Sequence, residues 1–210
     1  MTLVRKPTDI HRYFASEQSF CELYSPAIRL LNDVHWSPLR IIRKAVQFLA
    51  KRDGISILDI GSGVGKFCLA GAYYQPSVLF SGVEQRQYLI DEARLANERL
   101  GGLNVNFIYR NFTQLDFNQF DGFFFYNSFF ENLPGTGKID NRLEYTKELY
   151  DYYTFYLSRK FSELPEGTRI VTYCSWDDEM PSGYNLVETR EEGLLKFWKK
   201  GSKPDLYSPC

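Results

Sequence analysis

Three glycines, a carboxylate and a lysine lie close together in the stretch ILDIGSGVGKF, residues 57–67. Glycine lets the backbone approach a ligand without a clash from a Cβ atom, so such a loop could hold a phosphate, a dinucleotide or a nucleoside. Asp59 precedes the glycines, and a second acid, Glu84, ends the apolar run VLFSGVE at 78–84. The spacing of these residues decides among the three ligands.

A phosphate-binding loop of the type G-x-x-x-x-G-K-[ST] does not fit. Ile60 stands where the first glycine is needed, and Phe67 stands where a hydroxyl should ligate magnesium. A nucleotide triphosphatase is therefore excluded. Lys66, which first suggests a phosphate, is predicted to face solvent in the first turn of a helix.

The dinucleotide pattern G-x-G-x-x-G fits only in part, because Gly65 comes one position early and Lys66 takes the place of the last glycine. An NAD(P)-dependent oxidoreductase is weakened by this spacing but stays open. A third pattern fits better, since Asp59 at the end of one strand could hold a cation and Glu84 at the end of the next could accept two ribose hydroxyls. A ligand with an amino-acid cation, a ribose and no phosphate is S-adenosylmethionine.

Strand patterns alternate with helical patterns around this loop. Helices are expected at 37–54, where Ser37 is the predicted N-cap, and at 66–74, 85–102 and 141–162. Strands are expected at 55–61, 78–84, 105–111, 122–127 and 169–176, followed by two strands within 184–200 that turn through 191–193. The predicted fold is an α/β three-layer sandwich with a mostly parallel seven-stranded sheet and a C-terminal antiparallel hairpin. Residues 1–35 are predicted to form a helical cap, and residues 36–210 to form the ligand-binding domain.

In motif order and in its terminal hairpin, the chain resembles the class I S-adenosylmethionine-dependent methyltransferases over about residues 36–200. LDIGSGVG at 58–65 is similar to the first motif of that family, and GVE at 82–84 to its acidic second motif. The resemblance implies a Rossmann-like methyltransferase sandwich with S-adenosylmethionine as cofactor. The implied cofactor-binding residues are Asp59, Gly61, Ser62, Gly63, Gly65, Glu84, Asn111, Phe112 and Asn127.

Two of these positions depart from the family pattern or extend it. Asn111 replaces an acid that meets the adenine amine in many members, and Phe112 beside it is a second candidate adenine contact. The glycine loop together with FFFYNSFF at 123–130 is also similar to Dot1-type histone lysine methyltransferases. The chain lacks a strongly basic segment of the kind that nucleosome-binding members use.

YNSFFEN, residues 126–132, leaves the fourth strand at the edge where ligands bind in open α/β sheets. Asn127 resembles the first residue of the N-P-P-[YF] motif of amino-methylating enzymes, with Phe130 at the fourth place. Asn127 is therefore a candidate catalytic residue, with a loop cap as the alternative. Glu131 is a candidate for binding or deprotonating the nucleophile, with a solvated loop charge as the alternative. Both prolines of the motif are absent.

Composition restricts the possible partners. The formal net charge is −1 and the sequence pI is about 6.2, so no global basic field attracts nucleic acid or a membrane. The four cysteines and two histidines are too scattered for a zinc site or a disulfide framework, so no metal is expected. The N-terminal stretch lacks the apolar region of a signal peptide, which predicts a soluble, cytoplasmic protein.

The predicted function is transfer of a methyl group from S-adenosylmethionine to an unidentified nucleophile, with nitrogen favoured over carbon. A protein side chain or a small molecule is favoured as the acceptor over nucleic acid, and the oligomeric state stays open. A non-catalytic module that binds S-adenosylmethionine or S-adenosylhomocysteine is the main alternative to an enzyme.

Overall fold

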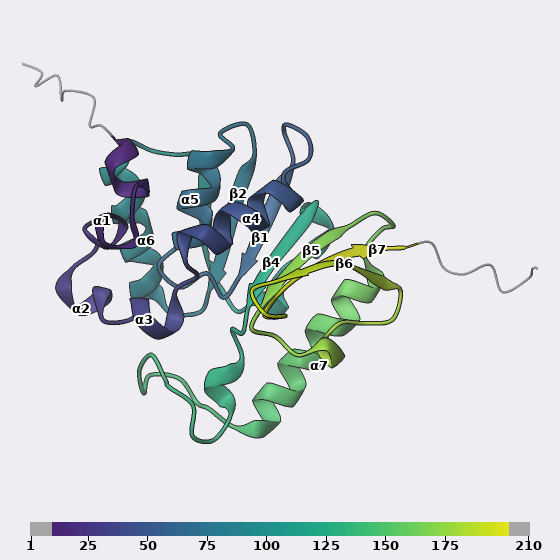
Figure 1. Cartoon of the computed structure of the whole chain (residues 1–210). Coiled ribbons are helices and arrows are strands. Elements are labelled where there is room, and N and C mark those ends of the chain that lie inside the picture. The colour runs from purple at the N-terminus through teal and green to yellow at the C-terminus, as the bar shows by residue number, and fades with distance from the viewer. Residues whose placement is uncertain (1–9, 202–210) are drawn as a thin grey trace, which may run out of the picture.

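The computed structural model describes residues 10–201 and has one seven-stranded sheet at its centre (Figure 1). The strands are β1 (Ser56–Ile60), β2 (Leu79–Glu84), β3 (Val105–Tyr109), β4 (Gly122–Tyr126), β5 (Arg169–Tyr173), β6 (Tyr184–Arg190) and β7 (Leu195–Lys200). Their order in the sheet is β3-β2-β1-β4-β5-β7-β6. The first five strands are parallel, and β7 pairs antiparallel with both β5 and β6. The predicted mostly parallel sheet with an antiparallel C-terminal hairpin is confirmed.

The central strand β4 shows why its sequence does not alternate between apolar and polar residues. Phe124 packs into the apolar cluster on one face of the sheet, whereas Phe123 and Phe125 pack into the cluster on the other face. Each of these rings is at most 2% exposed. A parallel strand that is covered on both faces needs apolar residues at every position.

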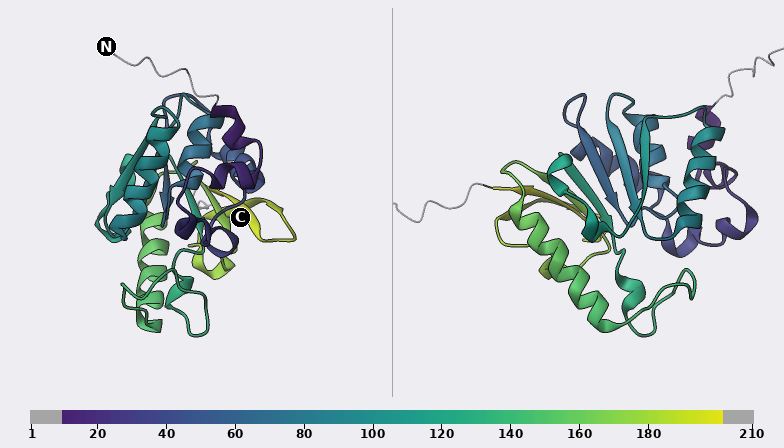
Figure 2. Two further views of the ribbon diagram at one scale, coloured as in Figure 1. Left: turned by 90° about the vertical axis from the view of Figure 1, so that its left-hand side faces the viewer. Right: turned by 180° about the vertical axis from the view of Figure 1, so that it is seen from behind.

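One face of the sheet is covered by α4 (Leu39–Leu49), α5 (Lys66–Tyr74) and α6 (Gln87–Arg99). Short helices from the N-terminal segment extend this layer at one end of the sheet, as Figure 2 shows. They are η1 (Ile10–Phe14), α1 (Glu17–Cys21), α2 (Pro26–Arg29) and α3 (Asn32–His35). Tyr24, which is 1% exposed, donates a hydrogen bond to the Val64 carbonyl at 2.9 Å and so joins these helices to the glycine loop. The domain boundary at residue 35 stays a prediction.

The opposite face is covered by one long helix, α7 (Lys147–Glu163), together with short 3-10 turns (Figure 2, right). The turns are η2 (Phe112–Gln114), η3 (Phe117–Gln119), η4 (Phe130–Asn132) and η5 (Asp177–Glu179). Leu157 and Phe161 anchor α7 to the sheet. This face therefore depends on aromatic packing from loops, such as the stacked rings of Phe117 and Phe123 at 5.2 Å between centroids.

Two predicted helix starts were wrong. α7 begins at Lys147, capped by the Thr146 hydroxyl, and not at residue 141. Helix α4 begins at Leu39, whose N–H donates to the Glu17 carboxylate at 2.5 Å, so this distant acid takes the role expected of Ser37. The helical period of the sequence did not reveal either start. The cap of α4 comes from a distant segment, and α7 follows a loop rich in polar side chains, and neither feature carries a helical period.

In the residues that the structure describes, no helix is both long enough and apolar enough to cross a bilayer.

Candidate functional site

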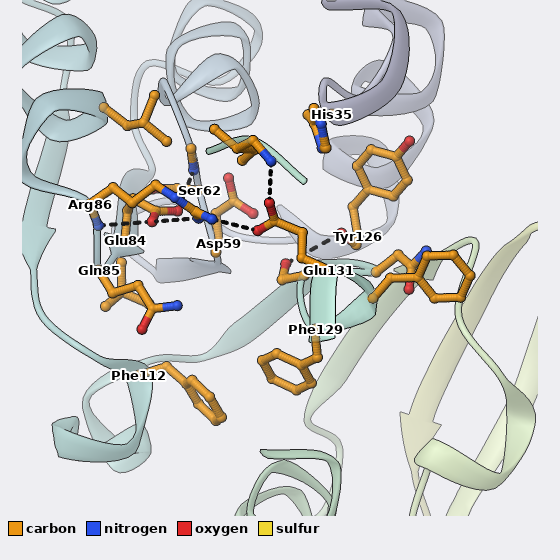
Figure 3. A pocket seen from close by; sticks show the side chains of 18 of the residues that line it. His35, Asp59, Ser62, Glu84, Gln85, Arg86, Phe112, Tyr126, Phe129 and Glu131 are labelled. Carbon is orange, nitrogen blue, oxygen red and sulfur yellow. Dashed lines mark hydrogen bonds and ion pairs between the residues drawn. The ribbon is translucent and has the colours of Figure 1, made fainter. Parts of the chain in front are cut away.

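A cavity of about 600 Å³ opens at the carboxyl ends of β1, β2 and β4 (Figure 3). Its size lies within the range of ordinary small-molecule sites. Its lining comes mainly from residues 35–37, the glycine loop with the start of α5 at 61–67, the ends of β2 and β3, the segment 126–132 and the loop at 137–145. Parallel strands bring these parts together because their carboxyl ends meet at one edge of the sheet.

The glycine loop turns the chain sharply from β1 into α5. Gly61, Gly63 and Gly65 all have positive φ, at 75°, 51° and 78°. At Gly65 the need for glycine is also steric, because a Cβ atom there would overlap the Phe107 ring. The N–H groups of Gly61 and Ser62 both donate to the Val83 carbonyl at 2.9 Å, which fixes the loop against β2.

Ser62 contributes backbone and packing to this loop. Its side chain packs against β2, since a Cβ atom on Gly82 would lie 2.6 Å from the Ser62 Cβ and Oγ atoms. The Ser62 hydroxyl is buried and finds no hydrogen-bond partner among the described residues. Ser62 therefore lines the cavity without presenting its hydroxyl openly to it.

Two buried carboxylates face the cavity beside this loop. Asp59 and Glu84 are 4% and 5% exposed. The Glu84 carboxylate accepts hydrogen bonds from the N–H of Gly63 at 3.2 Å and of Arg86 at 2.9 Å. The Asp59 carboxylate has no hydrogen-bond partner within the described part of the chain. Burial, and then the neighbouring Glu84 charge, raise the pKa of Asp59 well above its ordinary value.

An acid in this situation favours a cationic ligand. A buried carboxylate is costly unless it is paired, and Asp59 lines a cavity large enough for a ligand to supply the partner. The Glu84 oxygens each accept one hydrogen bond and keep capacity for hydroxyl donors. Asp59 and Glu84 thus fit a ligand that carries an ammonium group and a ribose. Among the described residues, no group of three metal-ligating side chains is found.

Asn111 and Phe112 lie at the other end of the cavity, after β3. The Asn111 side-chain oxygen accepts from the Thr113 N–H at 3.1 Å, and its amide nitrogen donates to the Tyr153 hydroxyl at 2.8 Å. The Phe112 ring stacks on Phe129 with 4.9 Å between centroids. Asn111 therefore holds the turn in place, while Phe112 forms an apolar wall (Figure 3).

The segment after β4 presents Asn127 to the cavity. Asn127 has a φ of 43°, a conformation that asparagine tolerates better than most residues, and its side chain makes no hydrogen bond to any described residue. The next residue, Ser128, donates to the Ile60 carbonyl at 2.6 Å. A Cβ atom on Gly61 would overlap the Ser128 side chain, so the glycine loop and this segment touch directly.

Glu131 is neither a solvated charge nor a free base. Its side chain is 13% exposed and pairs with the Arg86 guanidinium at 2.8 Å. Its second oxygen accepts from the Ile139 N–H at 2.5 Å. The carboxylate lines the cavity but is already bound on both oxygens.

Among the cavity residues that the sequence analysis did not single out, Arg86 and His35 are the ones that bring a cation and an imidazole. Arg86, which is 5% exposed, lies two residues after the acid that ends β2, and its position in GVEQR was the one available signal. His35 lines the cavity from α3, and no motif marks it. Burial lowers the pKa of His35, the Glu131 charge raises it, and the Arg86 charge lowers it further. The net shift favours the neutral form of the imidazole that lines the cavity.

The prediction that Lys66 faces solvent was wrong. Lys66 is 4% exposed, pairs with Glu17 at 2.5 Å and donates to the Asn32 side chain at 3.3 Å. Its ammonium group also lies over the rings of Phe20 and Trp36, at 5.5 and 5.4 Å from their centroids. The N-terminal helices cover this face of α5, which a pattern confined to residues 57–67 could not reveal.

The fold is that of known methyltransferases. TrmN from Thermus thermophilus superposes with a TM-score of 0.60 at 18% identity, covering 83% of this chain and 52% of that chain. An RNA methyltransferase from Salinibacter ruber in complex with S-adenosyl-L-homocysteine gives a TM-score of 0.57 at 16% identity, covering 82% of this chain and 97% of the other. The predicted Rossmann-like methyltransferase fold is confirmed.

Sequence comparison points to the same class of protein, methyltransferases, over part of the chain. Residues 53–125 match a family described as "Putative methyltransferase". A tRNA (guanine-N(7)-)-methyltransferase from Synechococcus sp. (strain JA-3-3Ab) is 42% identical over 77 residues, 37% of this chain and 29% of the relative. One of the same name from Microcystis aeruginosa (strain NIES-843 / IAM M-2473) is 46% identical over 54 residues, 26% of each chain.

These matches agree with the predicted class, a methyltransferase of the class I type. The chain spans less than a third of the length of these curated relatives. The matched family segment ends at residue 125, before Asn127 and the loop that lines the rest of the cavity. The similarity to Dot1-type enzymes finds no support in these proteins and stays a prediction.

Proposed function

We propose that this chain is an S-adenosylmethionine-dependent methyltransferase. The observation that carries the proposal is the pair of buried acids, Asp59 and Glu84, beside a glycine loop in a cavity of about 600 Å³. In this proposal Asp59 pairs with the ammonium group of the cofactor, and Glu84 accepts the ribose hydroxyls. Phe112 contacts the adenine, while the backbone of Gly61, Ser62, Gly63 and Gly65 approaches the amino-acid part.

When bound, S-adenosylmethionine supplies a methyl group that is already activated by the sulfonium charge. The nucleophile forms a bond to the methyl carbon as the carbon–sulfur bond breaks, and the electron pair of that bond goes to sulfur. The protein's contribution is then positioning and exclusion of water. In our proposal the Asn127 carboxamide binds the nucleophile, either by accepting a hydrogen bond from it or by donating one to it. The carboxamide can do so because it lines the cavity and forms no hydrogen bond with a described residue.

We further propose that the acceptor is a nitrogen of an RNA base. Two observations support this over the protein or small-molecule acceptor that composition favoured. The curated relatives are named tRNA (guanine-N(7)-)-methyltransferases. The part of the cavity lined by residues 126–145, which we call the acceptor side, includes the flat side chains of Tyr126 and Phe130, which suit a planar base. The global charge of −1 then requires that phosphate contacts be few or local.

Binding and transfer test the proposal separately. Calorimetry with S-adenosylmethionine, S-adenosylhomocysteine and NAD should show binding of the first two and none of NAD. NAD binding without the other two would support an oxidoreductase instead. Radiolabelled methyl transfer to bulk tRNA, protein and metabolite fractions should place the label in RNA. Binding without transfer to any fraction would favour a non-catalytic module.

Variants then assign the roles of the two candidate catalytic residues. Asn127→Asp keeps the shape and the tolerance for positive φ but removes the amide donor, so turnover should fall by about 10–100-fold while cofactor affinity holds. Asn106→Asp, on the exposed side of β3, is the matched control. Glu131→Gln with full turnover would remove Glu131 from any role as a base.

A cytoplasmic location remains our expectation. It rests on cysteine usage, since the four cysteines are widely scattered in the sequence and form no CxxC motif.

A further inference from the structure

The Arg86 guanidinium is surrounded by carboxylates from three parts of the chain. It lies 2.8 Å from Glu131, 3.4 Å from Asp140 and 3.5 Å from Glu84. It also donates to the Tyr145 hydroxyl at 2.7 Å. One buried cation thus gathers two acids of the acceptor side and the acid proposed to bind ribose.

The partners on the acceptor side belong to one irregular stretch. Residues 133–146 contain no helix or strand, yet they form the outer wall of the cavity through Ile139, Leu143 and Tyr145. Loops of this length without regular structure are uncommon in compact domains and are frequently functional. This one needs side-chain anchors to hold its shape.

The anchors converge on Arg86. Glu131 binds Arg86 with one oxygen and the Ile139 N–H with the other. Asp140 accepts from the Tyr88 hydroxyl at 2.8 Å, and the Tyr145 hydroxyl donates to the Asp140 carbonyl at 2.9 Å. Removing the guanidinium would take this cationic partner from Glu131 and Asp140, whose side chains are only 13% and 17% exposed, at the point where the loop meets the domain.

Arg86 is also bound to Glu84, and this bond connects the two sides of the cavity. The backbone N–H of Arg86 donates to the Glu84 carboxylate at 2.9 Å, and the Arg86 guanidinium lies 3.5 Å from the same oxygen. A ribose hydroxyl that binds the remaining acceptor sites of Glu84 would therefore share that carboxylate with Arg86 and weaken its attraction for the guanidinium. The guanidinium would then pair more fully with Glu131 and Asp140.

We propose that Arg86 is a positioning residue that fastens the loop 133–146 to the ribose-binding acid Glu84. Cofactor binding and closure of the acceptor wall are coupled through it. The coupling is reciprocal, so a closed loop also favours the bound cofactor. This inference rests on the proposed function, because it takes Glu84 as the ribose acid.

Hydrogen exchange of the loop, measured with and without S-adenosylhomocysteine, tests the coupling in the full-length chain. In the wild type, the ligand should slow exchange of the amides at 137–145. In Arg86→Met, exchange there should be at least about tenfold faster without ligand, and the ligand should no longer slow it. Arg86→Lys should restore part of the effect because it keeps the positive charge. It should not restore all of it, since an ammonium group cannot bridge several groups as a guanidinium fork does.

Arg52→Met is the matched control, because Arg52 forms an exposed ion pair with Asp121 at 3.0 Å. If Arg86→Met does not fold, Glu131→Gln keeps the volume of the side chain and removes one anchor, and should still speed exchange at Ile139.

The outcomes separate the two proposals. A wild type that binds neither S-adenosylmethionine nor S-adenosylhomocysteine would overturn the proposed function. A wild type that binds S-adenosylhomocysteine while loop exchange stays unchanged would overturn only the coupling. The coupling would also be overturned if S-adenosylhomocysteine slowed loop exchange equally in the wild type, Arg86→Met and Glu131→Gln.

Discussion

The two sides of the cavity are held in different ways. On the cofactor side, the glycine loop is fixed by backbone hydrogen bonds to β2, such as that from the Gly61 N–H to the Val83 carbonyl at 2.9 Å. On the acceptor side, the loop 133–146 is held by side-chain ion pairs through Arg86, and a further pair links Lys66 to the N-terminal helices. Backbone geometry is encoded by a short motif, whereas ion pairs join residues far apart in the sequence.

The largest effect is expected where the loop backbone has no room to adjust. Gly65→Ala should lower the free energy of unfolding by about 2–5 kcal/mol, because it combines a positive φ with an overlap onto the Phe107 ring. Gly63→Ala is the matched variant, since Gly63 has positive φ but no atom within 4 Å of the added Cβ. It should cost only about 1–2 kcal/mol. Denaturant unfolding of both proteins measures the difference, and equal costs would show that the cofactor side is not rigid.

Glu84→Gln should produce the next largest effect, on cofactor affinity. Two charge-assisted hydrogen bonds to ribose become weaker, so binding of S-adenosylmethionine should weaken by about 30–100-fold in calorimetry. Glu98→Gln on the exposed side of α6 is the control. Affinity within about threefold of the wild type would mean that Glu84 does not bind the ribose. It would then also contradict the proposed coupling of cofactor binding to the loop 133–146 through Arg86.

The fold and the cofactor side could be predicted because their determinants are local. Apolar runs set the central strands, and the spacing of Gly61, Gly63 and Gly65 set the turn between β1 and α5. Those features are contained in a few neighbouring residues, which a single sequence displays directly.

The acceptor side could not be predicted in the same way. Glu131 was expected to be a base or a solvated charge, yet its partner Arg86 lies 45 residues earlier in the chain. Lys66 was expected to face solvent, yet Glu17, 49 residues earlier, pairs with it. Such ion pairs depend on how the segments fold together, and residue types alone do not specify them.

Asp59→Asn should have opposite effects on stability and binding. The pKa of Asp59 is raised in the folded protein, so between the unfolded and folded pKa values the folded state holds more protons. The free energy of unfolding therefore falls as pH rises through that window, and Asn removes this cost. The variant should melt at a higher temperature than the wild type at neutral pH without ligand.

The same variant should bind S-adenosylmethionine about tenfold more weakly, because its ammonium group loses a charged partner. For the wild type, affinity should fall on acidification through the raised pKa of Asp59, since the protonated acid does not pair with a cation. Melting scans and calorimetry across pH measure both effects. A variant less stable than the wild type at neutral pH would contradict an unpaired, costly Asp59.

Lys66→Met should have the smallest effect and bears on the N-terminal helices. Its ammonium group pairs with Glu17, but the Glu17 side chain is 43% exposed, so losing the pair costs little. Contacts with the rings of Phe20 and Trp36 are lost as well. Together we expect about 1 kcal/mol of lost stability, or roughly 2–4 °C in melting temperature.

The location of that loss matters more than its size. If Lys66 only holds the N-terminal helices, hydrogen exchange of residues 17–24 should speed up while affinity for S-adenosylmethionine stays within about threefold. Lys51→Met, at an exposed position after α4, should change neither. Affinity reduced by about tenfold or more would instead make Lys66 a partner of the cofactor carboxylate. The cofactor side would then also depend on a side-chain charge, and the difference between the two sides of the cavity would narrow.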